Sequence, residues 1–357
     1  MRADRRVDNM TKSWFIVRSH RLPFSIRLDR RVPWVWLALV SLIFIVLIVS
    51  VGYGEYPIPL FDVAKTILGL SSDGSNYAFV IYTLRLPRVI AAILVGAALA
   101  ITGTILQGLT RNPLAAPEIV GIEAGAGLAA VALIVLFPAI PVFVLPIAAF
   151  VGAFIAALLV YMLAWDRGSS PMRLILVGVG VGAIASALTS LMITFGNIYD
   201  VSQALVWLAG SVYGRTWKHV QILIPWLVVF IPLSWLKACE LNTLNLGDDV
   251  ARGLGSSVEW QRGLLLLACV ALAGASVATA GTIGFVGLIS PHLARQLVGP
   301  SHEGLIPTAA FVGSLVVALA DLLARSLFAP IELPCGVITA AVGAPYFLYL
   351  LYRNRNA

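Results

Sequence analysis

Long stretches without a charged side chain divide this sequence and constrain its fold more than any other feature. A helix that crosses a bilayer needs about 20 predominantly apolar residues. The 357 residues are 60% hydrophobic and 11% charged, which excludes both a soluble globular domain and a disordered chain. The charge-free stretches are 32–54, 89–110, 124–165, 174–199, 219–236, 263–294, 304–320 and 333–352.

Two of these stretches are too long for one helix. The stretch 124–165 is interrupted by Pro138 and Pro141 and predicts two helices. The stretch 263–294 contains several glycines and Pro291, and it predicts a seventh crossing followed by a short eighth at about 291–298. The chain is therefore predicted to be an all-α polytopic membrane protein with about ten transmembrane helices.

Basic residues indicate the orientation. Residues 1–31 contain nine Lys or Arg against three acids, and the stretch 32–54 that follows is too long for a signal-peptide core. If the crossings alternate, the side of the N-terminus collects 17 of the 24 Lys and Arg residues and the other side six. Both termini are therefore predicted to be cytoplasmic. The net charge of +7 is attributed to topology and contact with anionic membrane lipid, not to nucleic-acid binding.

The predicted organisation has three parts. Residues 1–31 form a basic cytoplasmic leader, which either lies along the membrane surface or is disordered. Residues 32–353 form the ten-helix domain, and residues 354–357 form a cytoplasmic tail.

Small residues indicate close helix packing. Ala92, Gly96, Ala100, Thr104 and Gly108 recur every four residues along the second predicted helix. Because the hydrophobic effect drives little association between helices in lipid, such a stripe predicts close backbone contact within a dense bundle.

An internal repeat is also predicted. A shift of 178 positions aligns eight identical residues of 100–121 with 278–299. Five crossings would separate the two copies and invert one relative to the other, as in many transporters.

A first polar patch lies at the outer ends of two predicted helices. Arg85 and Arg88 begin the second helix, and Arg325 ends the ninth. Asp321 precedes Arg325 by four residues and is expected to pair with it. These arginines either anchor helix ends at the headgroups or serve as a docking site, since the outer side is otherwise poor in cations.

Two further patches are predicted on the inner side. Residues 111–118 contain two prolines and predict a stiff structural turn. Residues 246–255 predict a short helix that begins at Asp248 and Asp249 and ends at Gly253 or Gly255. With Val250, Leu254 and Val258 on its surface, this helix is either a contact for a soluble partner or a solvated loop helix.

Catalytic and metal-binding motifs are absent from the sequence. No Gly-Lys pair occurs, which excludes a P-loop, and no metal-ligand cluster is found. Cys239, Cys269 and Cys335 lie far apart and are predicted to act as small hydrophobic residues. No catalytic residue and no metal site is therefore predicted. Asp321 and Glu123 lie near helix ends, which disfavours a proton-coupled secondary transporter.

At these patches the sequence resembles the FecCD family of ABC-importer permeases, from about residue 35 to 353. The family includes permeases for iron–siderophore complexes, haem and cobalamin. The matching segments are RLPR at 85–88, GAAL at 96–99 with Gln107, RNPLA at 111–115, WLAGS at 207–211, LGD at 246–248 with LG at 254–255, GFVGL at 284–288 with PH at 291–292, and ELP at 332–334 with GAP at 343–345.

The resemblance implies partners and a location. It implies a dimer with a second permease subunit, identical or paralogous, two cytoplasmic ABC ATPase subunits and an extracytoplasmic substrate-binding protein. The location it implies is the bacterial cytoplasmic membrane. It assigns no cofactor to this chain, because ATP and Mg²⁺ bind the ATPase subunits. The implied activity is import of an iron(III)–siderophore complex, with haem or cobalamin as alternatives. This chain itself would not be an enzyme.

The resemblance also implies roles for particular residues. Arg85, Arg88 and Arg325 look like the arginines that dock the binding protein. The segment 244–259 looks like the coupling segment that binds the ATPase. Its matched residues are Leu246, Gly247, Asp248, Asp249, Ala251, Leu254 and Gly255. The polar stretch 199–213 looks like a short outer helix beside the translocation pathway. The expected pathway residues are Tyr199, Gln203, Trp207, Ser211, Tyr213 and Pro334.

Overall fold

The computed structural model of the chain describes residues 14–18, 25–54, 56–69, 77–137, 141, 143–166, 168–327 and 331–353. The predicted tail, 354–357, lies outside the described residues. The elements in chain order are β1 (Trp14–Arg18), β2 (Ser25–Asp29), α1 (Val32–Gly52), α2 (Leu60–Ile67), η1 (Val80–Arg85), α3 (Leu86–Thr110), α4 (Ile122–Leu136), α5 (Val144–Ala164), α6 (Pro171–Phe195), α7 (Ile198–Leu208), α8 (Trp217–Leu236), α9 (Ala238–Asn245), α10 (Asp248–Gly253), α11 (Val258–Ala280), α12 (Val286–Val298), α13 (His302–Ser326) and α14 (Cys335–Arg353).

Within the described residues, eight helices are long and apolar enough to cross a membrane. They are α1, the continuous η1–α3 segment, α5, α6, α8, α11, α13 and α14. The apolar helices α4 and α12 are shorter, with 15 and 13 residues. The predicted divisions of 124–165 and 263–294 are both confirmed, the second at residues 281–285. Two predicted starts were too late, because the second helical segment begins at Val80 and α12 begins at Val286.

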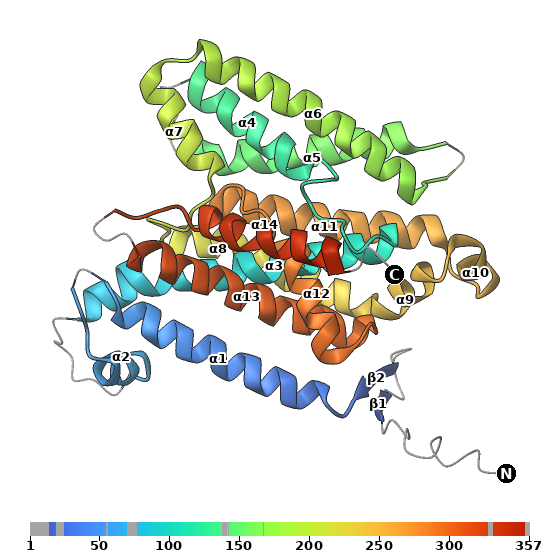
Figure 1. Cartoon of the computed structure of the whole chain (residues 1–357), viewed down its shortest axis with the longest axis horizontal. Coiled ribbons are helices and arrows are strands. Elements are labelled where there is room, and N and C mark those ends of the chain that lie inside the picture. Colours follow the sequence, from blue (N-terminus) through green and yellow to red (C-terminus); the bar gives the residue numbers. More distant parts are fainter. Residues whose placement is uncertain are drawn as a thin grey trace.

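The bundle has a buried centre and exposed outer helices. The apolar windows of α3 and α11 are 83% and 78% buried, whereas that of α6 is 17% buried. Figure 1 shows α3, α8, α11 and α13 in the middle of the molecule, with α4 to α7 forming a layer on one side and α1 and α2 on the other. The outer helices present many large apolar side chains, which need a lipid or protein environment.

The small-residue stripe of α3 lies at two close helix crossings. A Cβ atom on Gly96 would lie 2.2 Å from the carbonyl oxygen of Gly313 in α13. A Cβ atom on Gly103 would lie 1.8 Å from the carbonyl oxygen of Gly287 in α12. The predicted dense packing is therefore confirmed, because only glycine permits these backbone approaches.

The 178-residue shift does not pair equivalent structures. Residues 100–105 lie inside the continuous helix α3, whereas their partners 278–283 run across the end of α11 into the break. Residues 113–121 form turns, whereas 291–299 lie mostly in α12. This alignment of the two halves is therefore wrong, since glycine and alanine matched by composition rather than by position in the fold.

The N-terminal region contains a β-hairpin, which the sequence analysis did not anticipate. Strands β1 and β2 pair antiparallel, with Phe15 opposite Leu28. A run of aromatic and β-branched residues in β1 favours a strand. β2 contacts α13, where Leu28 lies near Gly304. The remaining residues of the predicted leader, 1–13 and 19–24, lie outside the described residues.

The two ends of the bundle carry different elements. Figure 1 shows β1, β2, α9, α10 and the end of α14 at one end, and α2 and α7 at the other. We call these the α10 end and the α7 end. The α7 end also holds the start of α3, the end of α13 and the start of α14, so two of the predicted patches lie at opposite ends of the molecule.

The α3–α13 crossing can be tested by Gly96→Leu. The new side chain would collide with the backbone of α13, so we expect a loss of about 3 kcal/mol in the free energy of unfolding in nanodiscs. Gly180→Leu on α6 is the matched control, because a Cβ atom there has no neighbour within 4 Å. Its expected effect is within about 0.5 kcal/mol. Equal stability of both variants would contradict the described crossing.

Candidate functional site

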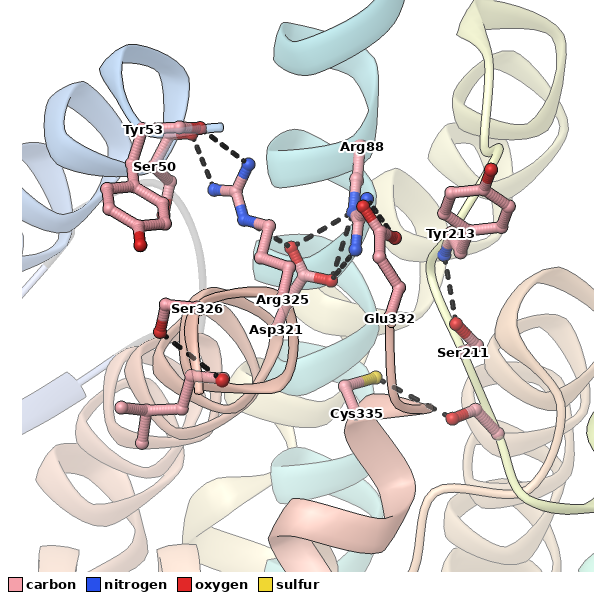
Figure 2. Close-up of polar contacts among 12 residues, drawn as sticks. Ser50, Tyr53, Arg88, Ser211, Tyr213, Asp321, Arg325, Ser326, Glu332 and Cys335 are labelled. Atoms are coloured by element: carbon pink, nitrogen blue, oxygen red, sulfur yellow. Dashed lines mark hydrogen bonds and ion pairs between the residues drawn. The ribbon is translucent and has the colours of Figure 1, made fainter. Parts of the chain in front are cut away.

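The arginine patch at the α7 end forms a cluster of buried ion pairs. Arg88 is 8% exposed, and its Nη2 lies 2.8 Å from Oδ1 of Asp321 on α13. Its Nε also donates to both Asp321 oxygens, at 3.1 and 3.2 Å. Arg88 Nη1 donates to Glu332 at 2.9 Å. Figure 2 shows the Arg88 guanidinium between these two carboxylates, which offset the cost of burying it.

Arg325 lies beside the same aspartate but directs its guanidinium elsewhere. Its Nη1 donates to the carbonyl of Tyr53 at 3.2 Å, and its Nη2 donates to the carbonyl of Ser50. The predicted pair with Asp321 is present, at 3.9 Å between Nε and Oδ2. Asp321 nevertheless binds Arg88 more closely, because the two residues meet across the α3–α13 crossing.

Arg85, like Arg325, donates hydrogen bonds to carbonyls at the C-terminal end of α1. Its Nη1 donates to the carbonyl of Val51 at 2.7 Å, and its Nη2 donates to that of Tyr56 at 2.7 Å. Helix C-termini leave carbonyls without partners, so Arg85 and Arg325 together satisfy the end of α1. Arg85 remains partly exposed, whereas Arg88 and Arg325 are buried.

The Arg88 cluster also meets the segment after α7. The Arg88 guanidinium lies 5.4 Å from the centre of the Tyr213 ring. Two residues after Pro334, the Gly336 N–H donates to the carbonyl of Gly210 at 3.0 Å. The start of α14, the segment 210–213 and the start of α3 therefore meet at one place (Figure 2). Sequence reasoning did not assign a role to Glu332, because its partner lies 244 positions away.

The expected pathway residues lie at the α7 end. The expected short helix is present as α7, and its Tyr199 and Gln203 are exposed, while Trp207 is partly buried. Ser211 donates its N–H to the carbonyl of Ala280 at 2.7 Å, which joins this segment to the end of α11. Tyr213 is exposed and Pro334 is partly buried. These residues share one end of the bundle but lie on two elements, the α7 segment and the start of α14.

The predicted short helix at the opposite end is confirmed as α10. Leu246, Val250 and Leu254 are 65%, 50% and 66% exposed, whereas Ala251 is fully buried. Gly247 and Gly255 flank the helix with φ angles of 116° and 86°, which favour glycine. Val258 was expected on this surface but is 3% exposed, because it begins α11 and packs into the core.

Asp248 attaches α10 to the bundle. Its Oδ1 lies 2.8 Å from Arg262 Nη2 on α11 and 3.6 Å from Arg111 Nη2 after α3. Asp249 is exposed, and its Oδ1 lies 3.3 Å from Nη1 of Arg252 on the same short helix. The two neighbouring acids thus differ, with Asp248 directed inward and Asp249 outward. Sequence reasoning missed Arg262, because it lies beside Glu259 and Gln261 just before the charge-free stretch 263–294, where an arginine is expected merely to mark a helix end.

The inner turn 111–118 has the predicted structural role. Asn112 Oδ1 accepts the Leu114 N–H at 2.9 Å. Glu118 Oε1 accepts the Phe285 N–H at 3.0 Å, just before α12 begins. Burial raises the pKa of the Glu118 carboxyl, and these backbone hydrogen bonds act in the opposite direction. Glu118 therefore caps α12 from a distant segment.

Metal ligation has no support in the part of the chain that the structure describes. No group of three or more His, Cys, Asp or Glu side chains that could hold a metal ion occurs there. Cys269 and Cys335 are buried free thiols, as predicted for small hydrophobic residues, and Cys239 is a free, exposed one.

Substitution of the two acids around Arg88 should show that the buried Arg88–Asp321 ion pair contributes more to stability than the partly exposed Arg88–Glu332 ion pair. The Asp321 side chain is 3% exposed and that of Glu332 is 35% exposed. We expect Asp321→Asn to cost about 3 kcal/mol of unfolding free energy, because it leaves Arg88 under-compensated. Glu332→Gln should cost under about 1 kcal/mol. Denaturant unfolding in detergent checks both, and equal losses would contradict the assignment of Asp321 as the main partner.

Comparison with known proteins identifies the family. Residues 42–353 match the model of the FecCD transport family. The protein named Probable siderophore transport system permease protein YfhA, from Bacillus subtilis strain 168, is 46% identical over 344 residues, covering 94% of this chain and 100% of that protein. The Fe(3+) dicitrate transport system permease protein FecD of Escherichia coli strain K12 is 42% identical, covering 86% of this chain and 95% of that protein.

A solved structure supports the same conclusion. It is described as an inward-facing conformation of a metal-chelate type ABC transporter, and it matches with a TM-score of 0.81 at 31% identity. The match covers 90% of this chain and 99% of that one. This chain therefore belongs to the FecCD transport family and is a multi-pass membrane permease subunit of an ABC transporter.

Proposed function

We propose that the chain imports an iron(III)–siderophore complex across the bacterial cytoplasmic membrane, powered by separate ATPase subunits. The observation that carries the substrate class is the 46% identity to a permease named for siderophore transport. Haem and cobalamin remain alternatives on the same machinery, because the family handles all three kinds of cargo. Iron would be cargo and not a cofactor.

The orientation follows from the distribution of charges between the two ends. We assign the α10 end to the cytoplasm, since residues 1–31 carry nine basic residues and lead directly into α1 there. In this orientation ten helices cross the membrane, namely the eight long helices and, in addition, α4 and α12. Both termini are then cytoplasmic.

The exposed surface of α10 supports binding of a cytoplasmic ATPase. Leu246, Val250 and Leu254 present apolar side chains to the aqueous side, although leaving them in water is unfavourable. Ala251 and Asp248 hold the opposite face of the helix to the bundle. Gly247, Asp249 and Gly255 complete the expected coupling segment. A short helix that is apolar outward and anchored inward suits a groove on a soluble partner.

The α7 end supports docking of the substrate-binding protein. Arg85, Arg88 and Arg325 gather there, and all three are engaged within the chain, as Figure 2 shows for the last two. Arg85 is the most accessible of them. A binding-protein carboxylate would approach Arg85 directly and reach Arg88 by replacing Glu332. Such rim charges should contribute orientation and association rate more than affinity.

The translocation pathway is proposed to lie between two permease subunits. The sparsely buried helices α6 and α14 and the short helix α7 carry the apolar faces that a second subunit would cover. Tyr199, Gln203, Trp207, Ser211, Tyr213 and Pro334 would line its outer mouth. No covalent chemistry is required of this chain, because a chelated iron arrives already coordinated.

Reconstitution tests the proposed function. Proteoliposomes would contain the permease with the ATPase encoded beside it, and the binding protein would be supplied loaded with ferric siderophores labelled with ⁵⁵Fe. We expect ATP-dependent uptake only in the complete system, without competition from haem or cobalamin. Uphill uptake by the permease alone would contradict the ABC mechanism, and uptake of haem or cobalamin in place of iron would overturn the substrate class.

The docking assignment predicts a salt-sensitive defect in Arg85→Glu. Reversing this charge should lower binding-protein stimulation of ATP hydrolysis about tenfold at 50 mM salt, with a smaller difference at 500 mM, because salt screens surface charges. Lys65→Glu on α2 is the matched control, since Lys65 is an exposed cation of the same end. Unchanged stimulation in Arg85→Glu would refute docking at this arginine.

A further inference from the structure

A fully buried arginine lies beside the coupling segment. Arg262 occupies the second turn of α11 and is 1% exposed. An arginine does not lose its charge in proteins, so a buried guanidinium must be compensated by partners. Arg262 Nη1 lies 3.7 Å from Glu259 Oε1 on the same helix, and its closer partners belong to two other segments, which suggest what the arginine does.

The first partner is the coupling segment itself. Arg262 Nη2 donates to Asp248 Oδ1 at 2.8 Å, at the first residue of α10. Asp248 is 21% and Arg262 1% exposed, so this ion pair is shielded from water more than the other ion pairs of α10. A displacement of α10 would therefore pull directly on Arg262.

The second partner is the turn that leads into α6. Arg262 Nη1 donates to the Ser169 carbonyl, and also to its Oγ at 2.9 Å. The Ser169 hydroxyl and N–H both donate to Glu259 Oε2, at 2.6 and 3.0 Å. Glu259 lies one turn before Arg262 on α11, so the two side chains hold Ser169 together. Ser169 precedes the first residue of α6, Pro171, by two positions.

A second route from α10 to this turn is weaker. Arg252 on α10 reaches Glu259 only at 3.8 Å, and its side chain is 55% exposed. Exposed ion pairs at such distances contribute little. The buried Arg262 guanidinium is therefore the principal polar connection between α10 and the start of α6 in the described part of the chain.

We propose that Arg262 is the positioning residue that transmits movement of the coupling segment to α6. This inference rests on the proposed function, in which the ATPase binds α10 and α6 borders the pathway. The planar guanidinium binds Asp248 with one nitrogen and Ser169 with the other, so α10 and the α6 entrance move as one unit. α6 packs on α4 and α5, but only 17% of its apolar window is buried, so most of its surface is free of the rest of the chain and a force applied at its entrance can act on α6 together with these two neighbours.

The test uses Arg262→Lys in the complete reconstituted transporter. Lysine keeps the charge, but its single ammonium cannot hold Asp248 and Ser169 in the same geometry. We expect ATP hydrolysis to persist while uptake per ATP falls at least about fivefold. A purely structural role would lower both in proportion. Uptake per ATP equal to that of the wild type would overturn the proposal.

A matched control and a second variant complete the design. Arg173→Gln removes an exposed arginine that pairs with Asp166 in the same turn but does not reach α10, and it should leave uptake per ATP unchanged. If Arg262→Lys does not assemble, Asp248→Ala decides, because it removes the carboxylate through which α10 binds Arg262. A lowered uptake per ATP in Asp248→Ala supports transmission through Arg262, and an unchanged ratio contradicts it.

Failure of the proposed function gives a different result. Leu254→Gln makes the exposed surface of α10 more polar and should weaken binding of the ATPase measured by co-purification. If Leu254→Gln binds the ATPase as the wild type does, the assignment of α10 as the coupling surface is wrong. If Leu254→Gln is defective but both Arg262→Lys and Asp248→Ala keep the wild-type ratio, only the role of Arg262 is wrong.

Discussion

Burying a charge in an apolar bundle is costly unless the charge is paired, and this constraint organises both ends of the molecule. At the α7 end, Arg88 is compensated by Asp321 and Glu332. At the α10 end, Arg262 is compensated by Asp248 and by the Ser169 carbonyl. Each cluster joins helices that are distant in sequence. In the proposed mechanism, the buried arginines therefore also couple the movements of the helices that they join.

Between the two clusters, packing depends on the absence of side chains. The crossings of α3 with α13 and α12 bring backbones together at Gly96 and Gly103. Close approach of this kind surrounds α3 with other helices, whereas only 17% and 28% of the apolar windows of α6 and α14 are buried. A densely packed centre with exposed peripheral helices agrees with the proposal that a second permease subunit covers α6 and α14.

Local sequence patterns predicted the helices well, but they could not predict contacts between residues that are distant in the sequence. Charge-free stretches located the spans, and Asp248 with the flanking glycines predicted α10, because these signals act within a few residues. The partnership of Arg88 with Asp321 was missed, because the two lie 233 positions apart and Arg325 was the nearer candidate. The alignment at a shift of 178 paired non-equivalent segments because small residues serve many helix crossings alike. The hairpin was missed because the nine basic residues of 1–31 were interpreted chiefly as a signal of orientation.

In the proposed mechanism, α10 and the entrance of α6 form one unit on which the ATPase acts. Cryo-electron microscopy of the assembled transporter with and without ATP tests this mechanism directly. We expect α10 to lie in a groove of the ATPase in both states, and Arg262 to keep its contacts to Asp248 and Ser169 while α6 changes its position. An ATPase bound away from α10, or an α6 that shifts after Arg262 has released Ser169, would contradict this mechanism.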